Sequence, residues 1–361
     1  MNIRTIATTT LACCAAAGSW AQSSITIGGV IDAAARQVRN EGRGAVSSLA
    51  SGGNSTSRLI FRGSDDLGDG MSASFHLETG LLLDTGTSAS ATQFWDRRST
   101  LSLATPALGE LRGGRDYVPT YTLWTRHDPF SYVGVAGSTN LLANSQQGPV
   151  RAAFGTTANT LVRASNTLQW LLPSAPAGMA GLEGGVMVSA REGGNSADGQ
   201  HKLQGVRLGY VTKAFSVGAA TSTTESNLTT LGRFRDTSVG AIGELGMARV
   251  SAAWRRLSYG PATQTDVMLG LWWPVAGGEV KASWHRANLD GKVGSTAVQA
   301  NDATQWGLGY VYSLSRRSAL YASCSRISND GAATFTVPGG ASGMTAGGRS
   351  TGYELGVRHT F

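Results

Sequence analysis

The chain has 361 residues, of which 41% are hydrophobic and only 15% are charged, and it contains 49 glycines but 9 prolines. The 30 Lys+Arg against 23 Asp+Glu give a net charge of +7, spread without basic runs, which argues against a nucleic-acid-binding protein. No stretch after Ala21 approaches the roughly 18 consecutive apolar residues of a membrane-spanning helix. If this chain lies in a membrane, it must cross it as a closed β-barrel, which leaves no unpaired backbone edge in lipid.

The N-terminus has the layout of a secretory signal peptide. Arg4 precedes an apolar and small-residue run at 6–17, and small residues occupy positions −3 and −1 of a cut after Ala21. We therefore expect residues 1–21 to be removed and residues 22–361 to form one domain. An N-terminal core helix and a lipoprotein anchor are the weaker alternatives.

Alternation of apolar and polar residues recurs along the rest of the chain, and short connections alternate with long ones. This pattern predicts about sixteen strands, an even number with short turns on one rim and long loops on the other, as in single-chain bacterial barrels. The expected strands lie near 24–38, 56–65, 71–80, 96–105, 110–117, 161–172, 180–191, 201–212, 214–223, 232–244, 247–259, 266–275, 279–288, 302–313, 317–328 and 350–361.

The last of these segments is the clearest strand. Its apolar face has an aromatic residue at each end, and its other face is polar, which suits lipid outside and water inside. The apolar face consists of Tyr353, Leu355, Val357, His359 and Phe361. A soluble β-sandwich or propeller would also explain the alternation, but it gives no reason for aromatic residues to gather at strand ends. We therefore predict an all-β protein, a transmembrane antiparallel β-barrel.

Five segments carry a family pattern, at 22–32, 57–70, 96–103, 113–117 and 162–170. In order and spacing they resemble the Gram-negative porin family, in particular the trimeric general porins of β-proteobacteria. Gly28 departs from the family, which usually has a tyrosine at this position. The resemblance implies a homotrimer in the outer membrane, in contact with its lipid and lipopolysaccharide, and it implies that the terminal Phe361 is an assembly signal.

Arginine suits the wall of a diffusion pore because it stays ionised at all working pH values. In the second expected strand Leu59 and Phe61 take the lipid side, which turns Arg58 and Arg62 into the lumen. In the strand 161–172 the outward Leu168 and Trp170 leave Arg163 inside, on one face with Ser165, Thr167 and Gln169.

The resemblance implies a pore constriction with a basic cluster at Arg58, Arg115 and Arg163, completed in our prediction by Arg62, Asp116 and Asp128. Alternation alone would put Arg115 on the same side as Leu111, so its place in the lumen requires a local irregularity. The alternative is that these arginines lie at the membrane interface or form salt bridges with carboxylates of the loops.

The resemblance also implies a long loop, here about 118–158, that folds back into the barrel and narrows it. This loop contains Arg126, His127 and Asp128 but no carboxylate cluster, which favours a preference for anions.

Signals for an enzyme are weak in this chain. The five histidines show no pair at metal-ligand spacing, there is no Gly-x-Ser-x-Gly segment, and the only cysteine outside the signal peptide is Cys324. We expect neither a cofactor nor a metal. The predicted function is passive diffusion of small hydrophilic solutes and ions, and the alternatives are a substrate-specific channel or a barrel that acts mainly as a surface adhesin.

Overall fold

The computed structural model describes residues 24–142, 147–173, 175, 179–190 and 201–361. The expected signal peptide and the new N-terminus at Gln22 lie outside this part of the chain. Within it, no helix has the length and apolar character needed to cross a membrane.

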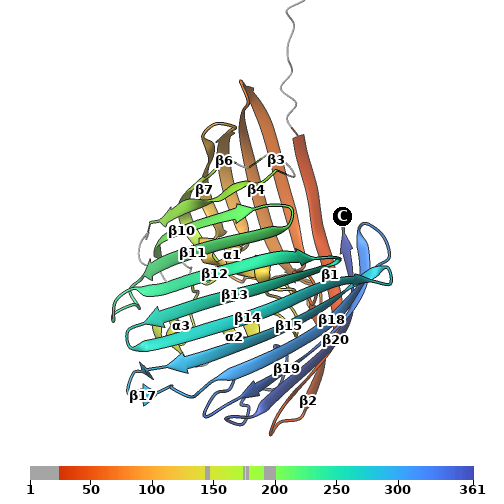
Figure 1. Ribbon diagram of the computed structural model, residues 1–361, viewed down its shortest axis with the longest axis vertical. Helices are drawn as coiled ribbons and strands as arrows, with labels where there is room; N and C mark the ends of the chain where they lie inside the picture. Colours follow the sequence, from red (N-terminus) through yellow and green to blue (C-terminus); the bar gives the residue numbers. More distant parts are fainter. Residues whose placement is uncertain (1–23, 143–146, 174, 176–178, 191–200) are drawn as a thin grey trace, which may run out of the picture.

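The strands form one closed antiparallel β-barrel of 16 strands, in which each strand pairs with the next and the last pairs with the first (Figure 1). This confirms the predicted fold. The barrel strands are β1 (Ser24–Asn40), β3 (Arg58–Gly68), β4 (Met71–Leu82), β6 (Arg98–Thr105), β7 (Gly109–Tyr117), β8 (Arg163–Leu171), β9 (Gly181–Ser189), β10 (Lys202–Val211), β11 (Phe215–Glu225), β12 (Phe234–Leu245), β13 (Ala248–Tyr259), β14 (Ala262–Val275), β15 (Gly278–Asp290), β18 (Ala303–Ser313), β19 (Ser318–Asn329) and β20 (Arg349–Thr360).

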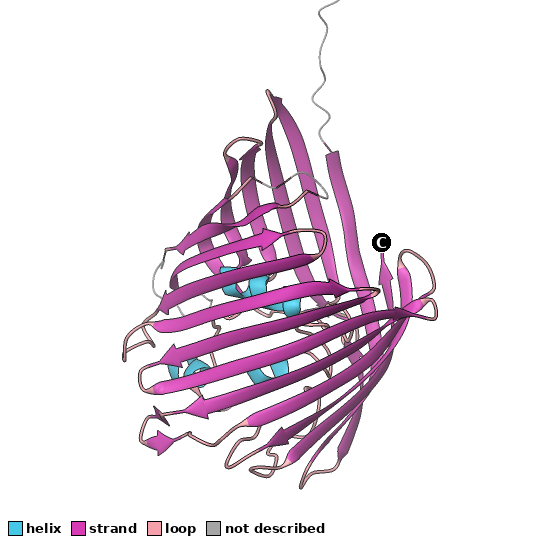
Figure 2. Cartoon of the chain, in the orientation of Figure 1, coloured by secondary structure: helices cyan, strands magenta, loops and turns pink. Residues whose placement is uncertain are grey.

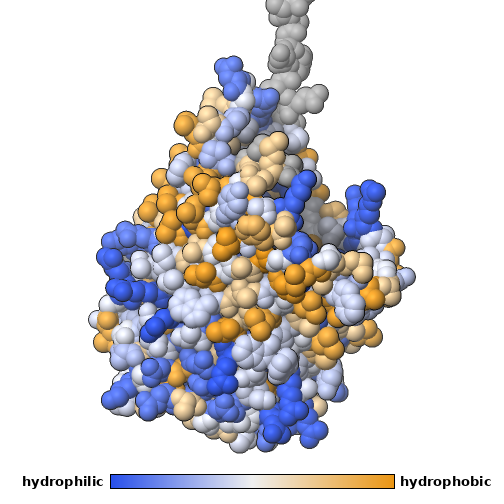
Figure 3. Space-filling view, viewed as in Figure 1, coloured by the Kyte–Doolittle hydropathy of each residue, from blue (hydrophilic) through white to orange (hydrophobic). Residues whose placement is uncertain are grey.

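Side chains alternate between an apolar exterior and a polar interior, as the period of a strand requires. In β20, Leu355 is 66% exposed on the outside, whereas its neighbour Glu354 is only 4% exposed because it points inward. Hydrophobic side chains gather over the visible outer surface of the strands, with hydrophilic ones towards the loops (Figure 3). Such a surface is matched to a lipid bilayer.

One strand of the barrel wall was not predicted. β2 (Ala45–Ser51) pairs with the second half of β1, while β3 pairs with its first half. The two are therefore halves of one wall strand, interrupted at 52–57. The small and polar composition of 45–57 concealed this half-strand, because apolar alternation was the signal used to find strands. The remaining strands are the short pieces β5 (Thr87–Ser88), β16 (Lys292–Val293) and β17 (Thr296–Ala297).

The barrel closes where the chain end meets β1. Gly29 N donates to Phe361 O and Phe361 N donates to Gly29 O, both at 3.1 Å. A Cβ atom on Gly29 would lie 2.7 Å from the Phe361 ring and 2.4 Å from the main-chain oxygen of Arg58. The close approach of the terminal ring thus requires glycine at this position.

We predict that Gly29→Val weakens this closure, because the added side chain has no space between two strands. Overpacking of this kind costs about 1–3 kcal/mol. The folded barrel should then unfold at a lower temperature, which is measured by the shift from compact to unfolded mobility on gel electrophoresis after heating. Gly44→Val is the matched control, since a Cβ there meets nothing within 4 Å. Equal unfolding temperatures for the two variants would contradict the role of Gly29.

Candidate functional site

The chain leaves the end of β7 and folds into the barrel, as expected, over the described residues 118–142 and 147–162, hereafter the inner loop (Figure 2). The inner loop contains α1 (Pro119–His127), α2 (Thr139–Leu142) and α3 (Pro149–Phe154). α1 contacts β9 to β14, α2 contacts β15, and α3 contacts β12 to β14. An opening remains between α1 and the wall of β6 to β10, with α1 contributing Pro119 and Thr122 to its lining.

Polar side chains of the wall hold this inner loop by its backbone. Ser251 Oγ, Gln264 Nε2 and Gln305 Nε2 donate to main-chain oxygens of the loop at 2.6, 2.8 and 2.9 Å. Glu354 accepts a hydrogen bond from a loop N–H at 3.3 Å. Because a loop inside a barrel cannot pair as a strand, these side chains satisfy backbone groups that would otherwise lack partners.

Asp128 fixes the turn that follows α1. Its carboxylate accepts hydrogen bonds from the main-chain N–H groups of Phe130, Tyr132 and Ser138 at 2.8, 2.9 and 2.8 Å. The side chain is buried, and the residue is 1% exposed. Asp128, which we expected at the constriction, is therefore bonded within the loop rather than directed towards open solvent.

We predict that Asp128→Ala loosens the inner loop, because three buried N–H groups lose their acceptor. Leaving a buried polar group unsatisfied costs about 1–3 kcal/mol. The expected results are larger fluctuations of the single-channel current and faster tryptic cleavage after Arg126. Asp84→Ala, at an exposed position in the loop after β4, is the control. Unchanged current noise and proteolysis would show that the loop does not depend on this carboxylate.

His127 ends α1 as a buried, neutral side chain. Its Nδ1 lies 2.8 Å from the main-chain oxygen of Leu123. Burial, assisted by the neighbouring positive charge of Arg126, lowers the pKa of His127 below its usual range. Arg126 itself pairs with Glu183 on β9. Glu183 also pairs with Arg207 at 2.8 Å. His127 therefore adds no charge to the lumen, whereas two arginines share one carboxylate.

A cluster of arginines lies on the wall facing the start of the inner loop. Glu78 on β4, which is 5% exposed, lies between two guanidinium groups. Arg58 Nε is 3.5 Å from its carboxylate, and Arg97 Nε donates a hydrogen bond to the same oxygen. His76 Nε2 is 3.3 Å from the other oxygen. One carboxylate thus faces two permanent positive charges.

Tyr117 extends this cluster to a third arginine. Its hydroxyl accepts hydrogen bonds from Arg97 at 2.9 Å and from Arg163 at 3.4 Å. The Arg163 guanidinium lies over the Tyr117 ring, 4.8 Å from its centroid, and the ring stacks on Tyr121 of α1 at 5.1 Å. Arg58, Arg97 and Arg163 with Glu78 and Tyr117, hereafter the arginine cluster, thus lie where the wall meets the inner loop.

The interruption between β2 and β3 positions Arg58. Asp32 is completely buried and accepts hydrogen bonds from three successive N–H groups, at residues 53–55, at 3.1, 3.0 and 2.7 Å. The segment 52–57 in turn fixes the guanidinium of Arg58. Arg58 Nη1 donates to Ser55 Oγ at 3.2 Å and to the main-chain oxygen of Thr56 at 2.8 Å. A buried carboxylate on β1 therefore fixes the orientation of a cluster arginine.

A second charged group lies beside the opening next to α1. Asp116 is buried and pairs with Arg98 at 3.2 Å and with Arg112 at 2.8 Å, and it accepts a hydrogen bond from Gln169 at 3.0 Å. Arg112 also pairs with Glu110 at 2.7 Å. The expected residue Asp116 is thus inside the barrel, neutralised by arginines that the sequence analysis had not selected.

Arg62 lies at a distance from the arginine cluster. It is exposed and lines a recess of the lumen together with Arg98 and Arg112. Its position agrees with the strand alternation that predicted it. Arg58 lies four residues away on the same strand and therefore on the same face.

Arg115 is not joined to the arginine cluster by a hydrogen bond. It donates to the main-chain oxygen of Asp96 at 2.7 Å and to Ser165 Oγ at 2.8 Å. In the register of β6 and β7 it lies opposite Ser99, on the face that carries the exposed Leu101. The alternation argument was therefore the better guide for this residue, and Arg97 lies where the resemblance had suggested Arg115.

The expected common inner face of β8 is also interrupted. Thr167 and Gln169 are buried on the inside as predicted, but Asn166 has φ +56° and the pairing with β7 shifts there. Ser165 therefore bonds to Arg115 instead of facing the lumen. Arg163 still reaches Tyr117 because it stands at the first residue of the strand.

Arg97, Glu78 and Tyr117 were missed as site residues. Arg97 lies in a segment that the resemblance had marked, but it precedes β6, so alternation says nothing about its direction. Glu78 and Tyr117 are ordinary strand residues in sequence. Only the pairing of β4 with β6 and the return of α1 bring them together.

A closed barrel with an apolar exterior, a charged interior and a loop that narrows the lumen defines a membrane pore. The family model described as "Gram-negative porin" matches residues 7–332, so this chain belongs to the Gram-negative porin family. Outer membrane porin protein 32 of Delftia acidovorans is 33% identical to it, over 97% of this chain and 98% of that protein. The protein is accordingly an outer-membrane porin that forms a passive channel, and family and fold point to a channel rather than an enzyme.

Solved structures agree with this assignment. The anion-selective porin from Comamonas acidovorans superimposes with a TM-score of 0.80 at 30% identity, covering 94% of this chain and 100% of that chain. A loop-deletion mutant of OmpT, an outer membrane protein of Vibrio cholerae, has a TM-score of 0.64 at 13% identity, covering 94% and 99% of the two chains. The second similarity concerns the fold alone.

Proposed function

We propose that the constriction of this porin is the arginine cluster and that it makes the channel prefer anions. The observation that carries the proposal is the sharing of Glu78 by Arg58 and Arg97, while Arg163 has no carboxylate partner among the residues that the structure describes. The cluster thus has three positive charges against one negative charge. The Comamonas porin with the same fold bears the description anion-selective.

Other charged groups beside the cluster also favour a positive potential in the lumen. Arginine keeps its charge at every working pH, and a water-filled lumen with low-dielectric walls concentrates the resulting field. Burial keeps the pKa of His127 low, so this side chain adds no positive charge. The Asp128 carboxylate is directed towards main-chain N–H groups of the loop. The neighbouring recess of the lumen is lined by Arg62, Arg98 and Arg112 against Glu110, and two of these arginines also pair with Asp116.

We predict that replacement of both Arg58 and Arg163 by glutamine shifts the reversal potential in a salt gradient towards cation permeation. A unit charge about 7 Å from an ion in water contributes roughly 0.6 kcal/mol. The anion-to-cation permeability ratio should therefore fall by roughly threefold or more at low salt, and less at high salt, where screening is strong. Planar-bilayer recordings of the purified protein measure this ratio.

Arg256→Gln is the control, because Arg256 is exposed on β13, far along the sheet from the cluster. An unchanged permeability ratio in the double variant at low salt would refute the assignment of the constriction, as would an equal change in the control. The porin fold would remain in either case.

We further propose that the mature chain begins at Gln22 and assembles as a homotrimer in contact with outer-membrane lipid and lipopolysaccharide. The sequence pattern before Gln22 and the family support this proposal. Native mass spectrometry of protein extracted from outer membranes in mild detergent should detect three copies, each with Gln22 first. Monomers alone, an intact Met1 or an acylated Cys13 would each contradict it.

A further inference from the structure

Four arginines gather on the outside of the barrel, at the rim that carries the inner loop and the segment 330–348. Arg39 belongs to β1, Arg326 to β19 and Arg349 to the start of β20. Arg43 lies in the connection between β1 and β2. All four side chains are exposed, and they line one recess together with Glu41 and Thr351. We call this recess the outer arginine recess.

The strand register establishes that the recess faces outward. The neighbours of Arg39 on β1, Val38 and Asn40, are buried inside the barrel, so Arg39 points out. Thr351 on β20 pairs with Arg39 on one side and with Arg326 on the other. The three residues form one row across adjacent strands, on the opposite face from the pore.

Two tryptophans continue this row and mark its depth in the membrane. Arg326 pairs with Trp306, which is 62% exposed, and Trp306 pairs with Trp284. Exposed aromatic residues of transmembrane barrels lie in girdles at the level of the lipid headgroups. The outer arginine recess is therefore at headgroup height, on the rim of the long loops, which in such barrels faces the outer leaflet.

The guanidinium groups of the recess have no carboxylate partner among the residues that the structure describes. Arg43 Nε donates to the main-chain oxygen of Gly343 at 2.6 Å, and the carboxylate of Glu41 accepts from the main-chain N–H of Arg349 at 2.9 Å. Four positive side chains thus share one recess with a single carboxylate already in use. Mutual repulsion disfavours this arrangement unless an anion is bound.

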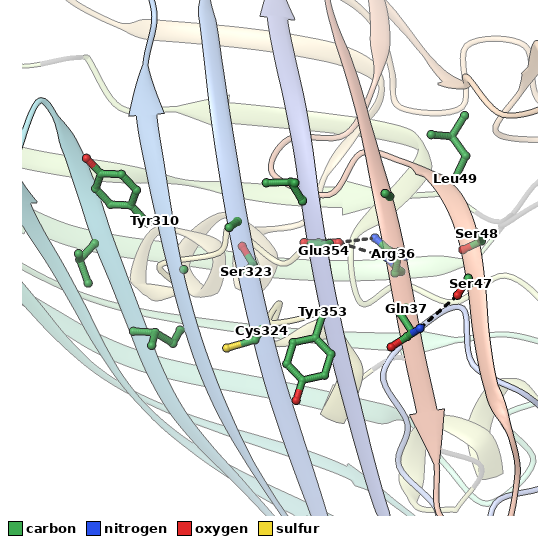
Figure 4. A pocket seen from close by; sticks show the side chains of 16 residues that line it. Arg36, Gln37, Ser47, Ser48, Leu49, Tyr310, Ser323, Cys324, Tyr353 and Glu354 are labelled. Atoms are coloured by element: carbon green, nitrogen blue, oxygen red, sulfur yellow. Dashed lines mark hydrogen bonds and ion pairs between the residues drawn. The ribbon is translucent and has the colours of Figure 1, made fainter.

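An apolar hollow continues from the recess along the outer surface. Its volume is about 1020 Å³ in the part lined by β1, β2, β15 and β18 to β20. Figure 4 shows Tyr353, Cys324 and Gln37 on three neighbouring strands of this part. The hollow exists because small side chains lie between large ones. Its adjoining part, over β14 to β20, includes Arg326 and Thr351, which also line the recess.

We infer that the outer arginine recess and this hollow bind a phosphate-bearing lipid of the outer leaflet. The phosphates would be held by Arg39 and Arg326 and by the two arginines above them, because the planar guanidinium matches phosphate oxygens in a bidentate manner. The acyl chains would occupy the hollow. A second copy of this chain is a poorer occupant, since its own arginines would add to the positive charge that must be neutralised.

This inference specifies the proposed lipid contact and rests on it, but it is independent of the arginine cluster and of ion selectivity. Native mass spectrometry in mild detergent tests it, with diphosphorylated lipid A as the added lipid and its dephosphorylated form for comparison. The wild type should retain the diphosphorylated lipid, and the double variant Arg39→Gln and Arg326→Gln should bind it about tenfold more weakly. Arg256→Gln, an exposed arginine without such neighbours, should bind it like the wild type.

Several results would overturn the inference. These are equal lipid binding by the double variant and the wild type, equal binding of the dephosphorylated lipid, and complete displacement of the lipid by equimolar inorganic phosphate. Loss of oligomers in the double variant with unchanged lipid binding would instead assign the recess to a second copy. Bilayer recordings on the same samples distinguish a failure of this inference from a failure of the proposed constriction. If lipid binding fails while the anion preference is normal, the proposed pore remains intact.

Discussion

The hydrogen bonds that join the first strand to the last are the constraint on which the rest of this structure depends. β1 pairs with β20 on one side and with β2 and β3 on the other, so the sheet has no free edge. In a bilayer, closure is what makes a β-sheet possible at all, because lipid offers no partner for backbone groups. Once the barrel is closed, the side chains of each strand point alternately to the lipid outside and to the water inside. The terminal Phe361 takes part directly, through its backbone and its ring.

Closure also determines where the backbone of the inner loop can find hydrogen-bond partners. A loop inside the ring cannot extend the sheet, so its backbone is bonded to serine, glutamine and glutamate side chains of the wall and to its own Asp128. Its apolar side chains pack around Trp124, Phe154 and Leu257. The loop is thereby held against one part of the wall, and the charged residues of the opposite part remain beside the open lumen. The position of the pore follows from where the loop is anchored.

Arginine is used on both faces of this barrel, with different surroundings. Inside, Glu78 and Asp116 each pair with two arginines, so that rigid groups with an excess of positive charge border the lumen. Buried ion pairs of this kind contribute little net stability, but they fix the positions of charges. Outside, the arginines of the recess have no described carboxylate partner and lie next to apolar surface. The same residue type thus suits a diffusing anion on one face and an anchored phosphate on the other.

The sequence by itself determined the barrel, the approximate positions of its strands and the inward direction of Arg58, because alternation with a period of two is a local property. The inner loop was implied by the resemblance to the porin family, not by alternation. The sequence did not reveal β2, whose small and polar residues lack that alternation, or the shift at Asn166, where one residue in a left-handed conformation changes the face of its neighbours. Arg97 was missed because it precedes β6, where its direction is decided by contacts with Glu78 and Tyr117, and these come from other strands. Arg115, which only the family resemblance had placed at the constriction, bonds to Asp96 and Ser165 instead. Only the tertiary structure could decide which arginines meet, since a cluster is made by the pairing of β4 with β6 and by the return of α1 to the wall, neither of which is encoded in any single segment.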